Sequence, residues 1–221
     1  MKIDQIIYSR RKTLALIVRA DGTLLVRAPQ RANRLQIVQF VESKTDWIRR
    51  TQEKIKRLPP PAPARQYKPG ESFLYLGKSY RLEIVDKATT RLSLKDRFYL
   101  SKKSLPSAPT VFTAWYKRRA REVLTARVQQ YAAQLGLKVS QVKITSARTR
   151  WGSCSAKGNL SFTWRLVMAP PPVIDYVVVH ELAHLRERNH SKRFWSLVQS
   201  YMPDYKTRQD WLKRNGAMLT L

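Results

Sequence analysis

All three histidines of this chain stand in one short segment, HELAHLRERNH, which begins at His180 and ends at His190. His180 and His184 are four positions apart, so on an α-helix their side chains project from the same face. Two imidazole nitrogens placed in this way can share one Zn²⁺ at about 2.0–2.1 Å. Glu181 follows the first histidine and can reach a water molecule on that metal. This H-E-x-x-H spacing is typical of a zinc hydrolase in which the glutamate is the general base.

A third metal ligand requires a turn after His184, because one straight helix cannot place three ligands around one ion. The polar segment 186–189 predicts this turn, and Asn189 is one of the few non-glycine residues that tolerate a left-handed helix end. His190 is then the expected third ligand, and Glu187 is the alternative, as a ligand or as a partner of a histidine. Three protein ligands leave a fourth position for water. We therefore expect one Zn²⁺ per chain, with other divalent metals as alternatives.

The competing interpretation is an ordinary surface helix whose histidines and glutamate are only solvated. Residues 173–179, which precede the motif, are nearly all apolar and predict a buried helix instead. Unpartnered imidazoles and a carboxylate are costly in such a place, which favours the metal site. Cys154 is predicted to be a small packing residue, because all three histidines serve the metal and none remains to activate a thiol.

The composition indicates a globular protein with a strongly basic surface. The 221 residues are 43% hydrophobic, which suits one large or two small domains. The net charge of +28 attracts polyanions, although scattered basic clusters can equally serve solubility, and no nucleic-acid recognition motif is present. A single cysteine fits a reducing compartment, and the apolar run 14–18 is too short for a signal peptide or a membrane span. We therefore expect a cytoplasmic protein without membrane contact.

The first part of the chain, residues 1–105, is predicted to be a strand-rich region with one long helix. Asp21-Gly22 between two β-prone runs predicts a hairpin, and Asn33 is a candidate cap of a helix that continues to about residue 55. The proline-rich segment 59–63 is expected to form a stiff connector. Strand patterns then occupy residues 67–103.

Residues 106–221 are predicted to form the catalytic domain. A long helix is expected from about residue 110 to 135, closed by Gly136. Two strands, 142–150 and 160–168, then precede the metal-bearing helix, whose first turn contains the prolines of residues 170–172. Ser191 is predicted to cap a further helix, and a last helix should run from about residue 203 to 214.

Five segments of this second part together resemble the YgjP-like metal-dependent hydrolase family: residues 150–155, 166–170, 174–185, 189–191 and 194–195. The fold of that family is similar to those of the zincin metallopeptidases and the SprT-like proteins. The resemblance implies an α+β fold with antiparallel strands beside the H-E-x-x-H helix. It also implies metal ligands at His180, His184 and His190, with Glu181 as the catalytic carboxylate.

The resemblance leaves the substrate open. The family is grouped with the metallopeptidases, yet pyrophosphohydrolase activity on nucleoside triphosphates, with UTP as substrate, is also attributed to it. Both reactions are attack of water on a polarised centre, so the metal site does not discriminate between them. A third hypothesis is an SprT-like protease associated with nucleic acid through the basic surface. The expected partners are therefore a peptide or an anionic substrate, with a nucleotide or nucleic acid as alternatives.

The strand before the metal helix carries the candidate substrate-binding residues Arg148, Arg150, Trp151 and Ser153. In zincins a strand beside the active helix binds extended substrate by edge addition. For a peptidase, Arg150 would be an oxyanion donor. For a nucleotide enzyme, Arg148 and Arg150 would hold phosphate and Trp151 would stack on a base. The competing interpretation places Trp151 in the core and the arginines in solvent.

Overall fold

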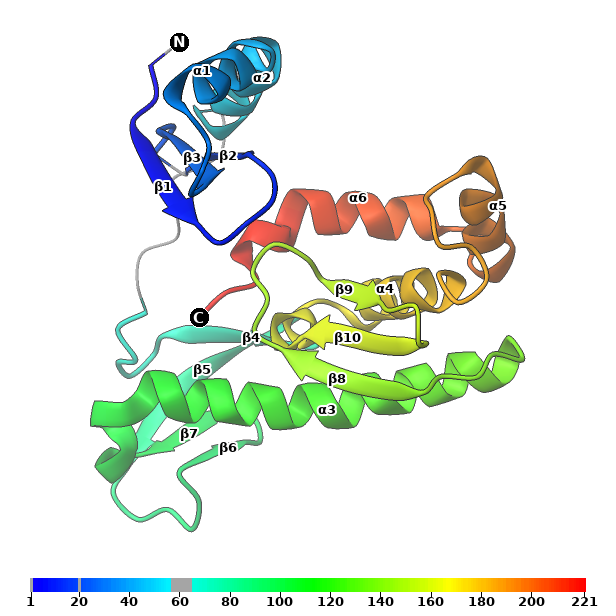
Figure 1. Cartoon of the computed structure of the whole chain (residues 1–221). Coiled ribbons are helices and arrows are strands. Elements are labelled where there is room, and N and C mark those ends of the chain that lie inside the picture. The colour runs from blue at the N-terminus through cyan, green and yellow to red at the C-terminus, as the bar shows by residue number, and fades with distance from the viewer. Residues whose placement is uncertain (1, 20, 57–64) are drawn as a thin grey trace. The chain divides into compact units, whose positions relative to one another are not determined.

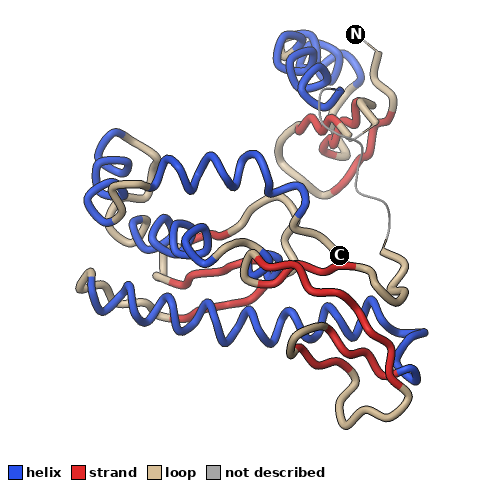
Figure 2. Tube along the Cα trace, turned by 180° about the vertical axis from the view of Figure 1, so that it is seen from behind, coloured by secondary structure: helices blue, strands red, loops and turns tan. Residues whose placement is uncertain are grey.

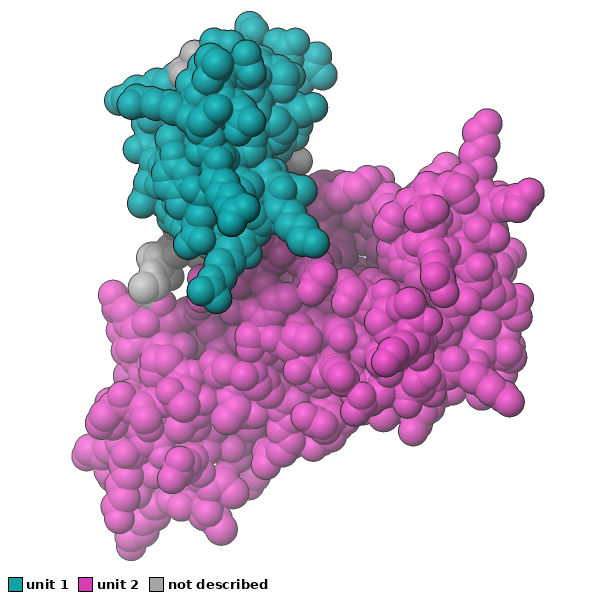
Figure 3. Space-filling model, viewed as in Figure 1, with its two compact units in different colours: residues 1–62 teal, residues 63–221 magenta. Residues whose placement is uncertain are grey.

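The computed structural model describes residues 2–19, 21–56 and 65–221. It divides the chain into two compact units, Met1–Ala62 and Pro63–Leu221 (Figure 3). Each unit has its own buried hydrophobic cluster. This division differs from the expected one at residues 105/106, because strands 72–101 pack with the second unit. The predicted proline-rich connector at 59–63 lies outside the described residues.

The first unit is a three-stranded sheet with two helices. Its elements are β1 (Gln5–Ser9), β2 (Ala15–Val18), β3 (Leu24–Pro29), α1 (Arg34–Glu42) and α2 (Thr45–Lys56). Strands β2 and β3 are antiparallel, and Gly22 between them has a φ of +82°, which confirms the predicted hairpin. Strand β1 pairs in parallel with the other edge of β3, so the sheet order is β1-β3-β2.

The single long helix predicted from Asn33 is wrong, because the structure has two helices. Asn33 does cap α1: its side chain accepts a hydrogen bond from the Gln36 backbone, and the Gln36 side chain accepts one from the Asn33 backbone. The break follows at Ser43, whose hydroxyl donates to Phe40 O, and at Thr45, whose hydroxyl donates to Glu42 O. Such local bonds offer the backbone an alternative to a continuous helix.

The second unit begins with a four-stranded sheet and the long helix α3. Its first elements are β4 (Ser72–Tyr75), β5 (Lys78–Val85), β6 (Leu92–Leu94), β7 (Phe98–Ser101), a 3-10 helix η1 (Lys102–Ser107) and α3 (Ala108–Gln134). These confirm the strands and the helix predicted here, and Gly136 ends the helix with a φ of +60°. The sheet packs on α3 through aromatic pairs: Phe73 lies 4.4 Å from Phe112, and Phe98 lies 4.9 Å from Trp115, between ring centroids.

The second sheet of this unit lies next to α3 and is mixed. It contains β8 (Gln141–Thr145), β9 (Gly152–Cys154) and β10 (Asn159–Thr163) in the order β8-β10-β9 (Figure 1). Strand β10 is antiparallel to β9 but parallel to β8, so the expectation of antiparallel strands holds only for one pair. The α+β fold class itself is confirmed.

Both strands predicted before the metal helix are shorter than expected. The first ends at Thr145, because the next carbonyls bond to side chains: Thr163 donates to Ala147 O, and Arg165 donates to Ser146 O. The chain then crosses over and returns as β9, which becomes an edge strand. The second strand ends at Thr163, and a 3-10 helix, η2 (Trp164–Met168), follows.

Three helices complete the second unit: α4 (Pro171–Ala183), α5 (Lys192–Tyr201) and α6 (Tyr205–Asn215). Prolines in the first turn of α4 and the Ser191 side-chain cap of α5 are as predicted. Helix α4 contacts α3, α5, α6 and β9. In the view from behind it lies between α6 and α3 (Figure 2). None of the described helices is long and apolar enough to span a membrane.

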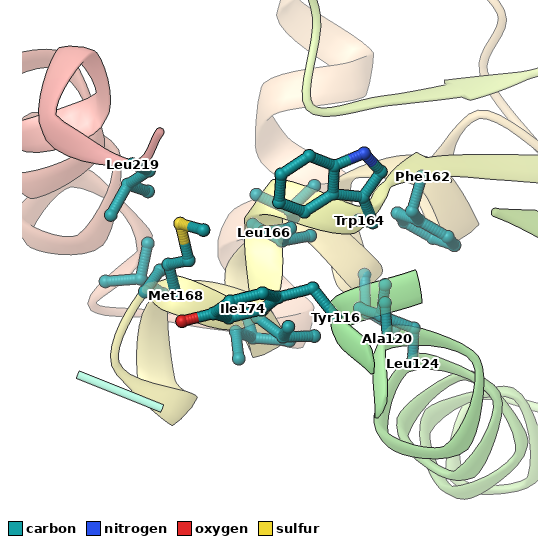
Figure 4. Close-up of a cluster of buried hydrophobic side chains, with 14 of the residues drawn as sticks. Tyr116, Ala120, Leu124, Phe162, Trp164, Leu166, Met168, Ile174 and Leu219 are labelled. Atoms are coloured by element: carbon teal, nitrogen blue, oxygen red, sulfur yellow. The ribbon is translucent and has the colours of Figure 1, made fainter. Parts of the chain in front are cut away.

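The start of α4 is fixed by the core and by the first sheet. Trp164, Leu166 and Met168 of η2 are buried in the cluster that also contains Tyr116 and Leu219 (Figure 4). The turn between β4 and β5 donates two backbone hydrogen bonds to η2, from Leu76 N to Val167 O and from Gly77 N to Met168 O. A Cβ at Gly77 would lie 2.9 Å from Pro170 Cα, so the turn meets the chain directly before α4. The four-stranded sheet thus helps to position α4, the helix that carries His180.

Candidate metal centre

The last turn of α4 and its C-cap carry the first two histidines of the motif. Helix α4 ends at Ala183, and His184 is its C-cap residue with φ −65° and ψ −14°. This nearly helical conformation keeps His184 on the same face as His180, and their ring centroids lie 5.0 Å apart. The buried apolar body of α4 therefore holds two imidazoles at one site.

The structure brings all three histidines together. His180, His184 and His190 each offer one ring nitrogen, and these atoms lie within 4.8 Å of one another. The Nε2 atoms of His180 and His190 are 3.0 Å apart. Nitrogen ligands at tetrahedral zinc are about 3.3 Å apart, given Zn–N distances of about 2.0–2.1 Å. The residues therefore fit a zinc ion, and their role as ligands stays a prediction.

The turn that returns His190 differs from the predicted one. The helix ends early through three backbone bonds, from Leu185 N to Leu182 O and from the amides of residues 186 and 187 to Ala183 O. Asn189 is not left-handed, because only Tyr67 and Leu76 have positive φ among the described non-glycine residues. That prediction is wrong because Asn189 lies six residues beyond the helix end.

Glu187 contributes through its backbone. Its carbonyl oxygen lies 3.0 Å from His184 Nδ1, and its carboxylate is not part of the histidine cluster. If Nδ1 donates this hydrogen bond, the lone pair of His184 is on Nε2, the nitrogen then available to a metal. Of the two alternatives for Glu187, metal ligand or partner of a histidine, this contact favours the second.

Aromatic residues of α5 pack against the imidazoles, and sequence reasoning missed this role. Phe194 stacks on His184 with ring centroids 4.5 Å apart, and Trp195 stacks on His190 at 5.7 Å. The Ser191 hydroxyl accepts a hydrogen bond from Phe194 N, which fixes the first turn of α5. The sequence signal was present, because both aromatic residues follow the cap by three and four positions.

The surroundings of His180 and His190 favour the neutral form of these two imidazoles. Burial and the neighbouring His184 and His190 lower the pKa of His180 to about 3. Burial and His184 also lower the pKa of His190. Neutral imidazole is the form that binds metal. His180 Nδ1 is buried without a hydrogen-bond partner in the part of the chain that is described.

Glu181 is a buried carboxylate beside this cluster. Its exposed fraction is 5%, and its Oε2 atom has no hydrogen-bond partner among the described residues. Burial raises the pKa of Glu181 to about 8, and Arg150 opposes this shift. A nearby cation favours the charged form of a carboxylate, so a metal at the histidines would lower that pKa. The environment of Glu181 therefore suits a group that exchanges a proton near neutral pH.

Gly152 gives Glu181 its space. A Cβ atom at Gly152 would lie 2.5 Å from Glu181 Oε1 and 2.6 Å from its Cγ, closer than real contacts allow. Any other residue at this point of β9 would displace the carboxylate. Sequence reasoning did not single out this glycine, because its partner is 29 positions away along the chain.

The histidines and Glu181 open into a cavity of about 360 Å³, which we call the histidine cavity. Its other lining residues are Arg188 and residues 152–156, which include the edge strand β9. Ser153 is one of these lining residues, and its role in binding substrate stays a prediction. Cys154 also lines the cavity, and burial raises the pKa of its thiol, which suits a packing residue better than a nucleophile.

The other candidate substrate-binding residues lie elsewhere. Arg148, Arg150 and Trp151 line a different cavity from that of the histidines. Trp151 also packs against Gly216 and the hydrophobic core, as one interpretation expected. Arg150 and Trp151 meet Ser153 only in a smaller cavity of about 90 Å³, and Arg148 does not line it.

The comparison with family models gives the class of this domain, which is a metallopeptidase domain. The chain belongs to the YgjP-like, metallopeptidase domain family, whose model matches residues 12–215. The UTP pyrophosphatase of Escherichia coli (strain K12) is 37% identical over 59 residues. That match covers 27% of this chain and 35% of that protein, so it spans about a third of the relative's length.

Two solved structures of metallopeptidase zymogens are also similar to part of the chain. Abylysin of Pyrococcus abyssi is 24% identical with a TM-score of 0.37, covering 39% of this chain and 89% of that one. Jannalysin of Methanocaldococcus jannaschii is 18% identical with a TM-score of 0.37, covering 41% and 94% respectively.

Proposed function

We propose that the chain is a zinc-dependent hydrolase of the metallopeptidase type, with Glu181 as its general base. One observation carries this proposal: three imidazole nitrogens lie within 4.8 Å of one another, and a buried carboxylate without a hydrogen-bond partner for Oε2 among the described residues lines the same cavity. Structural histidines and glutamates are normally hydrogen-bonded when buried, so this arrangement favours a catalytic centre.

The roles of the residues follow from their positions. A zinc ion held by His180, His184 and His190 would activate a water molecule and polarise the electrophilic centre of the substrate. The Glu181 carboxylate accepts the proton of the attacking water and then donates it to the leaving group. Gly152 lets this carboxylate approach the edge strand closely.

A peptide is the substrate that the histidine cavity supports best. Strand β9 is an edge strand, and its three residues line the cavity together with the histidines. An extended peptide can add to such an edge through main-chain hydrogen bonds, which would place a peptide carbonyl beside the metal site. Ser153, in the middle of this strand, is the candidate contact for the substrate.

A nucleoside triphosphate is the second candidate substrate. The relative in Escherichia coli is called a UTP pyrophosphatase, and an arginine-lined cavity lies at the segment that leads into β9. Water attack on phosphorus uses the same metal and the same base as water attack on a carbonyl carbon. The two hypotheses therefore share Glu181 and differ only in the substrate.

The test is a parallel assay of the zinc-loaded protein and its Glu181→Gln variant on casein and on a panel of nucleoside triphosphates. We expect the variant to retain zinc and to lose at least two orders of magnitude in rate on the true substrate. Zinc content is measured on the same samples. Full activity of a zinc-loaded Glu181→Gln variant would remove Glu181 from the mechanism.

A further inference from the structure

A second cavity of about 400 Å³ lies at the segment that leads into β9, and three arginines line it. We call it the arginine cavity and define it by Arg148, Arg150, Trp151, Arg165 and residues 216, 217 and 219–221. The cavity is built from well-packed elements: Leu219 is 2% exposed, and a Cβ at Gly216 would lie 2.8 Å from the Trp151 ring. Its volume is in the range of small-ligand sites.

Arg165 is held in place for binding. Its guanidinium carbon lies 4.3 Å from the centroid of the Trp164 ring, and its Nη1 donates to Ser146 O and Ala147 O at 3.2 and 3.4 Å. Both bonds use Nη1, so Nε and Nη2 have no acceptor among the residues that the structure describes. A stacked and partly bonded guanidinium loses little freedom when its remaining donors bind a ligand.

The charge of the arginine cavity is positive, although Arg150 also acts on the carboxylate of Glu181. No Asp or Glu side chain is among its described lining residues. None of the ion pairs within the described residues involves Arg148, Arg150 or Arg165. Burial, and then the charge of Arg148, lower the pKa of Arg165, so the two guanidinium groups repel each other. An anion in the cavity would relieve this repulsion.

The chemistry of the donors selects the kind of anion. Planar guanidinium groups with several free N–H donors match the tetrahedral oxygens of phosphate in a bidentate manner. Two or three such groups around one cavity can hold more than one negative charge. The arginine cavity and the histidine cavity have no described lining residue in common, and a smaller cavity of about 90 Å³ shares residues with both.

We infer that the arginine cavity is a phosphate site that binds a pyrophosphate-type group through Arg148, Arg150 and Arg165. It is distinct from the zinc ligands, and it does not depend on the proposed reaction. Metal-free protein therefore retains this binding.

The test is a calorimetric titration of metal-free protein with inorganic pyrophosphate at a fixed salt concentration of about 0.15 M, at which unspecific binding to the basic surface is screened. We expect saturable binding at one site per chain. Arg165→Gln and Arg148→Gln should each weaken it about tenfold or more, because each removes charge-assisted hydrogen bonds. Arg148 is exposed, so its replacement tests the site even if loss of the Arg165 bonds weakens the fold.

The matched control is Arg121→Gln, which removes the same charge from an exposed position on α3 outside the cavity. This variant should bind pyrophosphate within about twofold of the unchanged protein. Equal weakening by Arg121→Gln and Arg148→Gln, or no saturable binding at all, would overturn the proposal. A failed zinc assay with intact pyrophosphate binding would instead contradict only the proposed function.

A competition experiment with UTP distinguishes a nucleotide phosphate group from free pyrophosphate as the ligand. If the group belongs to a nucleotide substrate, UTP displaces pyrophosphate from the metal-free protein, and Arg148→Gln raises the KM of the zinc-loaded protein for UTP. If the cavity takes free pyrophosphate, UTP does not compete and the KM is unchanged. Both results require the arginine cavity to bind phosphate.

Discussion

At the level of single residues, Glu181 is the group whose surroundings differ most from those of an ordinary surface carboxylate. It is buried, its Oε2 has no hydrogen-bond partner in the described chain, and Gly152 lies against its side chain. A carboxylate in such surroundings lowers the stability of the fold, so its presence indicates a function. The residue-scale predictions therefore concern the neighbours of Glu181 on β9.

Gly152→Ala should abolish most of the activity without removing the metal. The added Cβ would lie 2.5 Å from Glu181 Oε1, so the carboxylate must move away from its position. A misplacement of about 1 Å in an active site commonly lowers the rate about a hundredfold. Turnover, zinc content and the midpoint of thermal unfolding are measured together. Unchanged turnover in a folded, zinc-loaded variant would show that Gly152 does not position Glu181.

Cys154→Ala is the companion variant two positions along the same strand. Its thiol is a packing group with a pKa that burial raises, and the mechanism uses no thiolate. We expect turnover within about twofold of the unchanged protein, and slow alkylation of Cys154 by iodoacetamide near pH 7. Loss of turnover with zinc retained would indicate a role for the thiol.

At the scale of elements, helix α5 carries the aromatic rings that contact the imidazoles, and the predicted third ligand, His190, lies just before this helix. Its N-terminal cap is Ser191, the residue directly after His190. Ser191→Ala should lower the free energy of unfolding by about 1 kcal/mol, because Phe194 N loses its acceptor. The same change should weaken zinc binding, since Phe194 and Trp195 pack on the histidines.

Ser200→Ala is the control for this cap. Ser200 lies on the same helix, and its hydroxyl donates to Leu197 O at an exposed position. We expect a change within about 0.5 kcal/mol and unaltered zinc affinity. Urea unfolding measures the free energy of unfolding of both variants, and zinc titration measures their zinc affinity. An equal effect of the two changes would contradict a specific role for the cap.

Much of this element order could be predicted from the sequence, because the signals are local. The cap at Asn33, the turn at Gly22, the prolines before α4 and the spacing of His180 and His184 each act within a few residues. The parallel pairing of β8 with β10 and the early end of β8 could not be predicted, because they depend on contacts between distant parts of the chain. The approach of Gly152 to Glu181 and the place of Arg165 beside Arg148 and Arg150 were missed for the same reason.

At the scale of the whole molecule, the two units have separate hydrophobic cores. Every buried member of the larger cluster lies at Tyr67 or beyond, and every buried member of the smaller one lies between Leu24 and Ile48. A chain of residues 65–221 should therefore fold cooperatively and bind zinc with the affinity of the full chain. Circular dichroism, thermal unfolding and zinc titration check this. An unfolded fragment would show that the second unit depends on the first.

The pH dependence of stability should reflect Asp175 on α4. Burial raises its pKa above the ordinary 3.8, and Arg127 at 3.5 Å opposes this only in part. The folded state then holds the proton more tightly than the unfolded state. The contribution of Asp175 to stability is thus greatest below about pH 4 and declines as the pH rises through the raised pKa.

Asp175→Asn removes this titration. The free energy of unfolding of the variant, relative to that of the unchanged protein, should increase between about pH 3 and pH 7. Urea unfolding of both proteins across this range measures the difference. A difference that is constant or that falls with pH would contradict the raised pKa.

The most direct test of the central claim is the zinc stoichiometry and coordination of the full chain. After zinc loading and dialysis, we expect one zinc ion per chain with three nitrogen neighbours at about 2.0–2.1 Å by X-ray absorption. His190→Ala should lose most of this zinc, because a helix with two histidines alone holds it weakly. A zinc-free protein after loading, or an unchanged zinc environment in His190→Ala, would contradict the account.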